Sequence, residues 1–115
     1  MQTFIKNIKH RLITIGFNEE DNAFIKTNKV TQPGQAMIIN GQRFEQPGID
    51  IDLIYKVYLL GDGWISNADD TNKKDLQWIK FEVYVGEEQQ AELTEAFYEN
   101  DLNRFNELTS KLFKV

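Results

Sequence analysis

The sequence predicts an α+β fold: an N-terminal helix, an antiparallel meander sheet of four or five strands, and one or two C-terminal helices packed on one sheet face. Three observations support this. An amphipathic helical pattern opens the chain, alternating apolar residues separated by short turns fill its middle, and apolar stripes of helical spacing close it. Strands joined by short turns pair antiparallel. The length agrees with a single domain over residues 1–115.

The first helix is predicted over about residues 2–15. Its apolar residues recur at helical spacing and form one stripe: Phe4, Ile5, Ile8, Leu12 and Ile15. Gly16 is the expected stop, because glycine accepts the left-handed backbone conformation that follows a last helical turn. In such an ending Phe17 folds back onto Leu12.

The next segment predicts a polar turn at 18–22, a short strand at about 23–29 and then two Gln-Pro-Gly triplets, at 32–34 and 46–48. Proline sets φ for the second position of a turn, and glycine permits a positive φ at the third. We interpret the triplets as turns that bracket one hairpin.

The clearest local signal is a β-hairpin over residues 36–45 with Asn40 and Gly41 at its tip. Both residues tolerate the positive φ angles of a type I′ turn. A two-residue turn places three large apolar side chains on one face, which we take as the core side: Met37, Ile39 and Phe44.

Two longer strands are predicted at about 49–60 and 76–85, because apolar side chains alternate along both. Between them we expect a turn at 61–63, a short strand at 64–66 and a polar loop at 67–75.

A helix is expected to begin at about residue 87, where Glu87 and Glu88 suit the positive end of the helix dipole. The apolar spacing then shifts at Asn100 and Asp101, which are both good N-cap residues. The pattern predicts either two consecutive helices or one helix kinked at this point, and it leaves both open.

The composition argues against several classes of function. The net charge of −5 disfavours nucleic-acid binding, and the absence of cysteine together with a single histidine, His10, excludes thiolate and multi-histidine metal sites. We find no catalytic triad, phosphate loop or calcium loop, so we expect no enzymatic activity, cofactor or metal. Without a long apolar segment or a signal-like start, we expect a cytoplasmic protein that does not enter membranes.

Two groups of charged residues keep alternatives open. The basic group Lys6, Lys9, His10 and Arg11 is either a solvated helix face that complements the helix dipole or a small contact patch for an acidic partner. The carboxylates Asp50, Asp52, Asp62 and Asp70 are either solvated strand and turn residues or the site of a small carboxylate-dependent hydrolase.

The aromatic residues suggest a binding surface. If the helices cover the face of Phe81, the opposite face presents the candidate partner-binding residues Tyr58, Trp64, Trp78, Lys80 and Tyr84. The alternative is that a helix covers this face, or that its aromatics pair singly across strands. We therefore hypothesise a non-enzymatic interaction module that binds a protein partner or itself. A structural or accessory subunit of a larger phage-type or secretion-type assembly is the second hypothesis.

Overall fold

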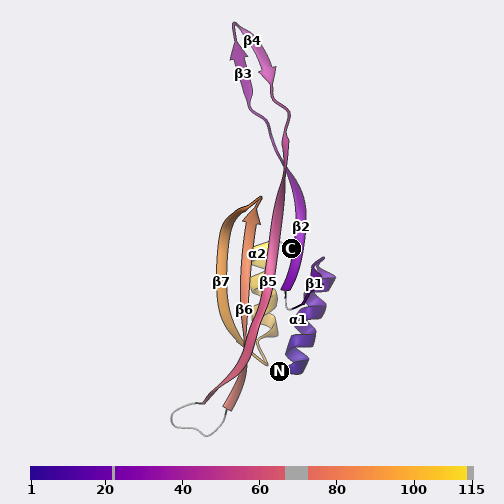
Figure 1. The fold of residues 1–115 in the computed structure, drawn as a ribbon, viewed down its shortest axis with the longest axis vertical. Coiled ribbons are helices and arrows are strands. Elements are labelled where there is room, and N and C mark those ends of the chain that lie inside the picture. Colours follow the sequence, from indigo (N-terminus) through magenta and orange to yellow (C-terminus); the bar gives the residue numbers. More distant parts are fainter. Residues whose placement is uncertain (22, 67–72, 114–115) are drawn as a thin grey trace.

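The computed structural model describes residues 1–21, 23–66 and 73–113. Helix α1 (Gln2–Thr14) comes first, the strands follow, and helix α2 (Leu102–Phe113) comes last (Figure 1). The strands form an antiparallel five-stranded sheet and a separate two-stranded one. The predicted α+β fold class is confirmed.

The large sheet has the strand order β1-β2-β5-β6-β7. Its members are β1 (Asn18–Glu20), β2 (Ala23–Gln32), β5 (Ile49–Ser66), β6 (Lys73–Val85) and β7 (Glu88–Tyr98). The small sheet pairs β3 (Ala36–Ile39) with β4 (Gln42–Glu45), and it is inserted between β2 and β5. Apart from this insertion, each strand of the large sheet pairs with the next one along the chain.

The end of α1 follows the predicted geometry. Gly16 has φ of +103°, and its N–H donates to the carbonyl of Ile13 at 3.1 Å. The N–H of Phe17 donates to the carbonyl of Leu12 at 2.9 Å. These two bonds define a Schellman ending. Lys26 of β2 adds a bond from its Nζ to the carbonyl of Ile15 at 2.6 Å, which ties the helix end to the sheet.

Both helices pack against the same face of the large sheet, the helix-covered face, and leave the other face open (Figure 1). Phe81 lies at the centre of the core, with its ring centroid 6.1 Å from that of Phe97 and 5.9 Å from that of Phe105. Seven phenylalanines are buried: Phe4, Phe17, Phe24, Phe81, Phe97, Phe105 and Phe113. Aromatic side chains bury large areas each, so this cluster supplies much of the hydrophobic stabilisation.

The helix predicted from residue 87 is wrong, because residues 88–98 form strand β7. Leu93 and Phe97 are four residues apart, and a spacing of four fits both a helix and a strand, whose side chains alternate with a period of two. Gly86, with φ of +61°, lets the chain turn back after β6, so that Leu93 lies opposite Phe81. Pairing with β6 is therefore what makes this segment a strand and not a helix.

The boundary predicted at Asn100 and Asp101 is present, and one helix follows it. The N–H of Phe105 donates to the carbonyl of Asp101 at 3.0 Å. The Asp101 carboxylate accepts the N–H of Tyr98 at 2.9 Å. This residue therefore joins the end of β7 to the start of α2.

The turn predicted at 61–63 is also wrong. β5 continues to Ser66, and its register against β6 shifts between Leu59 and Gly61. A β-bulge absorbs one extra residue and bends the strand without ending it. The short strand predicted at 64–66 is thus the end of β5, and β6 begins at Lys73, inside the predicted loop. Of that loop, residues 67–72 lie outside the described residues.

Two smaller elements extend the predicted pattern at the other edge of the sheet. Part of the polar turn predicted at 18–22 forms β1, which pairs with the start of β2, and Asp21 then turns the chain with φ of +53°. β2 itself continues to Gln32, because it pairs with β5 over its whole length.

We call residues 33–48, which contain β3 and β4, the arm. Its predicted hairpin is confirmed: Ile39 lies opposite Gln42, and Asn40 and Gly41 have φ of +51° and +78°. Its predicted core side is wrong, because the exposed fractions are 46% for Met37, 50% for Ile39 and 50% for Phe44. The arm projects beyond the end of the helix-covered sheet, where neither helix reaches it (Figure 1).

The arm joins the sheet through a narrow neck at the two Gln-Pro-Gly triplets. The N–H of Gln46 donates to the carbonyl of Gln35 at 3.3 Å. At Gly34, a Cβ atom would clash with the carbonyl oxygen of Gln46, so the two chain segments approach closely there. The neck lets the arm extend the molecule, which measures 78 × 27 × 22 Å.

Candidate functional site

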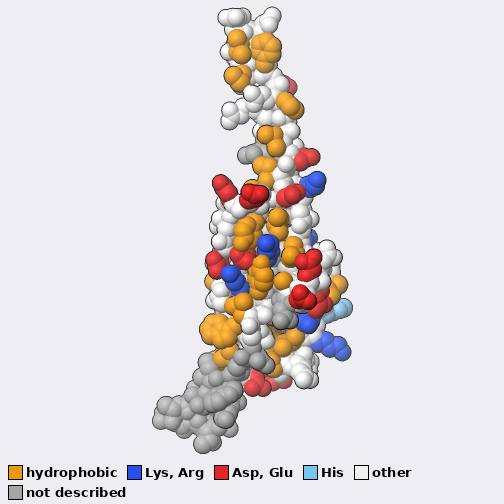
Figure 2. All heavy atoms as spheres, in the orientation of Figure 1, with side chains coloured by type: hydrophobic (Ala, Val, Ile, Leu, Met, Phe, Trp, Pro, Cys, Tyr) orange, Lys and Arg blue, Asp and Glu red, His pale blue; other side chains and the backbone are white. Residues whose placement is uncertain are grey.

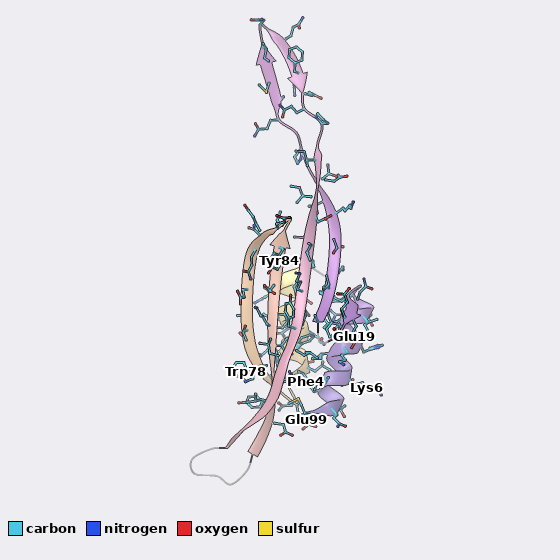
Figure 3. The ribbon with its side chains drawn as sticks, in the orientation of Figure 1. Phe4, Lys6, Glu19, Trp78, Tyr84 and Glu99 are labelled. Carbon is cyan, nitrogen blue, oxygen red and sulfur yellow. The ribbon has the colours of Figure 1, made fainter. Side chains whose placement is uncertain are left out.

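The open face carries four of the five predicted partner-binding residues. Tyr58 of β5 lies opposite Lys80 of β6, and Tyr84 lies further along β6. Tyr84 lies near the end of the strand, and Trp78 lies apart from it, near the middle of the strand (Figure 3). The backbone of Trp64 lies in β5 opposite Asp75, and its side chain is outside the described part of the structure.

A polar network fills the middle of this face. Glu82 is only 5% exposed, although no helix covers it. Its Oε2 accepts the Tyr84 hydroxyl at 2.6 Å and the Nε2 of Gln89 at 3.0 Å. The hydrogen bond to this carboxylate is the main cause that raises the pKa of Tyr84 to about 12, and desolvation adds to it. This role of Glu82 was not predicted, because alternation along β6 indicates only which face the residue occupies.

Lysine side chains complete the network by packing on the tyrosines. Lys56 Nζ lies 4.7 Å from the ring centroid of Tyr84, and Lys80 Nζ lies 5.8 Å from that of Tyr58. Lys80 also forms an ion pair with Glu92 at 3.3 Å. The tyrosines and Lys80 are therefore half-buried in contacts with one another, and apolar groups available to a partner lie elsewhere on the face.

The exposed apolar part of the open face lies beside Trp78, near the middle of β6. Trp78 is 45% exposed and Leu60 is 55% exposed. Trp78 lies between Gly61 of β5 and Ala96 of β7 in the sheet register. Because these two neighbours are small, they leave much of the indole ring uncovered. Figure 2 shows apolar and charged side chains alternating over this side of the molecule.

The arm is the second candidate surface. In the part of the chain that the structure describes, most large apolar side chains with high exposure lie on the arm or beside its neck: Val30, Met37, Ile38, Ile39, Phe44 and Ile49. Figure 2 shows apolar groups at the far end of the molecule. They occupy both faces of the hairpin, because Ile38 points away from the side that Met37 and Phe44 share.

The candidate catalytic carboxylates do not form a site in the described residues. Asp50 accepts a hydrogen bond from the Thr31 hydroxyl at 2.9 Å, and both Asp50 and Asp52 are exposed. No group of three metal-ligating side chains occurs within the described ranges. The side chain of Asp62 and the whole of Asp70 lie outside them.

None of the helices described here is long and apolar enough to span a membrane. Comparisons of the chain with protein-family models, with curated proteins and with solved structures find no match.

Proposed function

We propose that this chain is a non-enzymatic interaction module that assembles with further copies of itself, with the arm of one copy docking on the open face of the next. The exposed apolar side chains of the arm carry this proposal. Contiguous apolar patches on a protein surface mark interaction sites. An isolated two-stranded hairpin is marginally stable in water, so the arm gains stability when another surface packs against it.

A second copy is favoured as the partner because one chain presents both halves of an apolar interface. The arm is an apolar projection, and Trp78 and Leu60 make an apolar patch on the open face. Arg43 and Glu45 are the arm's charged residues and form an ion pair at 3.4 Å. The arm is thus electrically neutral, so it adds no repulsion of its own when it docks on a second copy, which carries a net charge of −5.

Binding between two different patches of the same chain is heterologous, and such contacts build rings or filaments. The proposal therefore also supports the alternative of a structural or accessory subunit in a larger assembly. The arm replaces the tyrosines of the open face as the main binding element, because the tyrosines are already engaged with lysine and glutamate side chains.

Light scattering during size-exclusion chromatography, over a concentration series, tests this proposal. We expect the wild-type mass to rise above the monomer mass of 13.5 kDa with concentration. The arm variant Ile38→Ser/Phe44→Ser should stay monomeric. Ile13→Ser is the matched control, because Ile13 is 52% exposed on α1 and should behave as wild type. A wild-type chain that is monomeric at every concentration would refute the proposal.

Mixing two variants tests which surfaces meet. The face variant Leu60→Ser/Trp78→Ser keeps an intact arm, and the arm variant keeps an intact face. Each alone should be monomeric, whereas an equimolar mixture should form a dimer through the one remaining arm–face pair. A mixture that stays monomeric would contradict docking of the arm on the open face.

A further inference from the structure

Met37, on strand β3 of the arm, carries the accessible sulfur atom of this chain. The sequence contains no cysteine and two methionines. Met1 packs against the core, and its side chain is only 9% exposed. Met37 is 46% exposed, because neither helix reaches the arm. Exposed sulfur atoms are common targets of mild oxidants in proteins, so an oxidant in solution meets this thioether first.

Met37 also lies on the side of the arm that is free of charge. It pairs with Phe44 across the hairpin, and Ile39 lies two residues along on the same side. The opposite side carries the ion pair of Arg43 and Glu45. Burying a charged group is costly, so the side of Met37 is the one that suits an apolar contact with the open face.

Oxidation of Met37 would change this contact. A thioether is apolar and flexible, and it packs favourably against aromatic rings. The open face of the next copy offers the indole ring of Trp78, which is 45% exposed. A sulfoxide is polar, and its oxygen loses water when it enters an apolar contact. The oxidised side chain therefore opposes docking of the arm.

A neighbouring donor allows the free arm to keep its fold after oxidation. The Nε2 of Gln46 donates to the Sδ of Met37 at 3.5 Å. A thioether sulfur is a weak acceptor. An oxygen atom bound to this sulfur would lie within reach of the same N–H group and would accept more strongly. The effect of oxidation therefore falls on docking and not on the hairpin.

We propose that Met37 is an oxidation site, and that a peroxide acting on it releases the arm from the open face of the next copy. This inference rests on the proposed function. The Met37 sulfur attacks one oxygen of hydrogen peroxide, so that an S–O bond forms and the O–O bond breaks. The departing hydroxide takes the proton of the new S–OH group, which leaves a sulfoxide and water. The sulfur loses two electrons and the peroxide gains them. Methionine sulfoxide reductases restore the thioether, so the step is reversible.

Graded treatment of the chain with hydrogen peroxide tests this proposal, with peptide mass mapping and light scattering as readouts. Mapping should show oxygen on Met37 before Met1. Assembly of the oxidised chain should need about tenfold higher protein concentration, because a polar group enters an apolar contact. Methionine sulfoxide reductases for both sulfur epimers should restore assembly. Equal oxidation of Met1 and Met37 would overturn the selectivity of the site.

Two variants assign the effect to the sulfur atom. Met37→Leu keeps the volume and apolar character of the side chain, so it should assemble as wild type does and stay insensitive to peroxide. Met37→Gln places a polar group there without an oxidant and should weaken assembly as oxidation does. Loss of assembly in peroxide-treated Met37→Leu would assign the effect to another side chain, such as Trp78, and overturn the proposal.

The outcomes separate the oxidation site from the docking of the arm. A wild-type chain that assembles equally well after complete oxidation of Met37 would overturn the oxidation site and leave docking in place. A chain that is monomeric before treatment would refute both. Amide hydrogen exchange of residues 36–45 in the monomer should not change on oxidation. Faster exchange there would show that oxidation unfolds the hairpin and would overturn a direct effect on docking.

Discussion

Phe81 and Phe44 both lie in antiparallel strands opposite an apolar residue, Val57 and Met37 respectively. Phe81 is 1% exposed, whereas Phe44 is 50% exposed. The strands of the two regions have the same alternation, and the difference comes from what packs against them. Helices cover one face of the large sheet, and neither reaches the arm. Strand pattern therefore identifies which side chains share a face, but a second layer decides whether that face is a core.

The largest expected effect is on the stability of the large sheet with its two helices, which we call the body. Phe81→Ala should lower the free energy of unfolding by about 3–5 kcal/mol, because it leaves a cavity among the rings of Phe97 on β7 and of Phe105 and Phe113 on α2. Phe44→Ala, the same substitution on the arm, should change it by less than about 0.5 kcal/mol in the monomer. Chemical denaturation at low protein concentration measures both. Similar losses in the two variants would show that the arm packs as the body does.

The next largest effect is expected from a substitution in the neck, which should destabilise the arm. Gly34→Ala places a Cβ against the backbone of Gln46, and overpacking of this kind costs about 1–3 kcal/mol. Since the strain lies where the arm leaves the sheet, amide hydrogen exchange should speed up in residues 36–45 and stay unchanged around Phe81. Gly61→Ala is the control, because a Cβ there meets nothing within 4 Å. Faster exchange in both regions would contradict an arm that folds separately from the body.

The smallest effect on stability at neutral pH is expected from a substitution of Glu82 on the open face. Neighbouring side chains bury this residue, and no helix covers it. Glu82→Gln should move the pKa of Tyr84 from about 12 back toward its ordinary value of 10.0. Titration of the Tyr84 ring carbon by nuclear magnetic resonance measures this shift. Tyr58→Phe is the control, which should leave most of the shift in place because the hydrogen bond to Glu82 is its main cause.

From the raised pKa of Tyr84 we also predict how the free energy of unfolding depends on pH. The pKa of Tyr84 is raised in the folded state, so the folded chain holds this proton more tightly than the unfolded chain. Its contribution is present below pH 10 and is lost as the pH rises toward 12. Wild-type stability should therefore fall more steeply over this range than that of Glu82→Gln. Parallel curves for the two proteins would show that the hydrogen bond is not formed in solution.

Much of the fold was predictable from local chemistry. The Schellman ending at Gly16 and the type I′ turn at Asn40 and Gly41 depend on residues adjacent in the chain, and both are present. The β7 strand was not predictable, because the spacing of Leu93 and Phe97 satisfies two periods and only pairing with β6 separates them. The continuation of β5 past Gly61 likewise depends on its partner strand.

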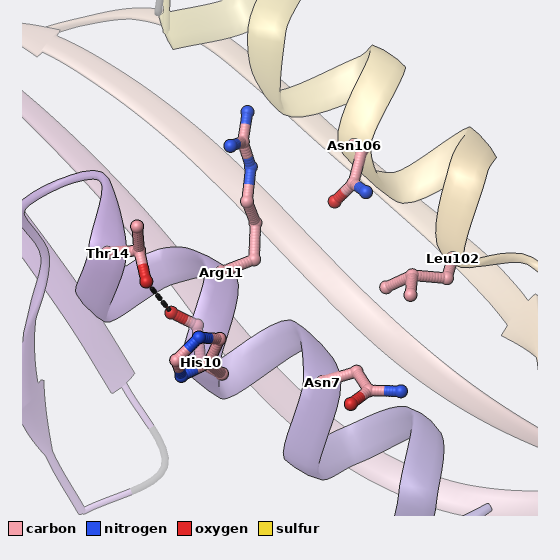
Figure 4. A pocket seen from close by; sticks show the side chains of 6 residues that line it. All are labelled: Asn7, His10, Arg11, Thr14, Leu102 and Asn106. Atoms are coloured by element: carbon pink, nitrogen blue, oxygen red, sulfur yellow. Dashed lines mark hydrogen bonds between the residues drawn. The ribbon is translucent and has the colours of Figure 1, made fainter.

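The candidate surfaces were also predictable only in part. That Trp78, Lys80 and Tyr84 share a face follows from alternation along one strand. Their exposure depends on neighbours in other strands, such as Ala96 beside Trp78, and on the helices packing on the opposite side. A groove between α1 and α2, which Arg11 of the predicted basic group lines, joins residues from the two ends of the chain, so no local pattern could have indicated it (Figure 4).

The sequence by itself determined the α+β class, the α1 boundary, the hairpin register and the side chains that alternate on each strand, because these follow from backbone preferences and from neighbours along the chain. Only the tertiary structure decided which sheet face is covered, that the arm is exposed, that Glu82 is buried and that residues of α1 and α2 line one groove. Burial and grooves are properties of contacts between distant segments, so they arise only when the layers pack together.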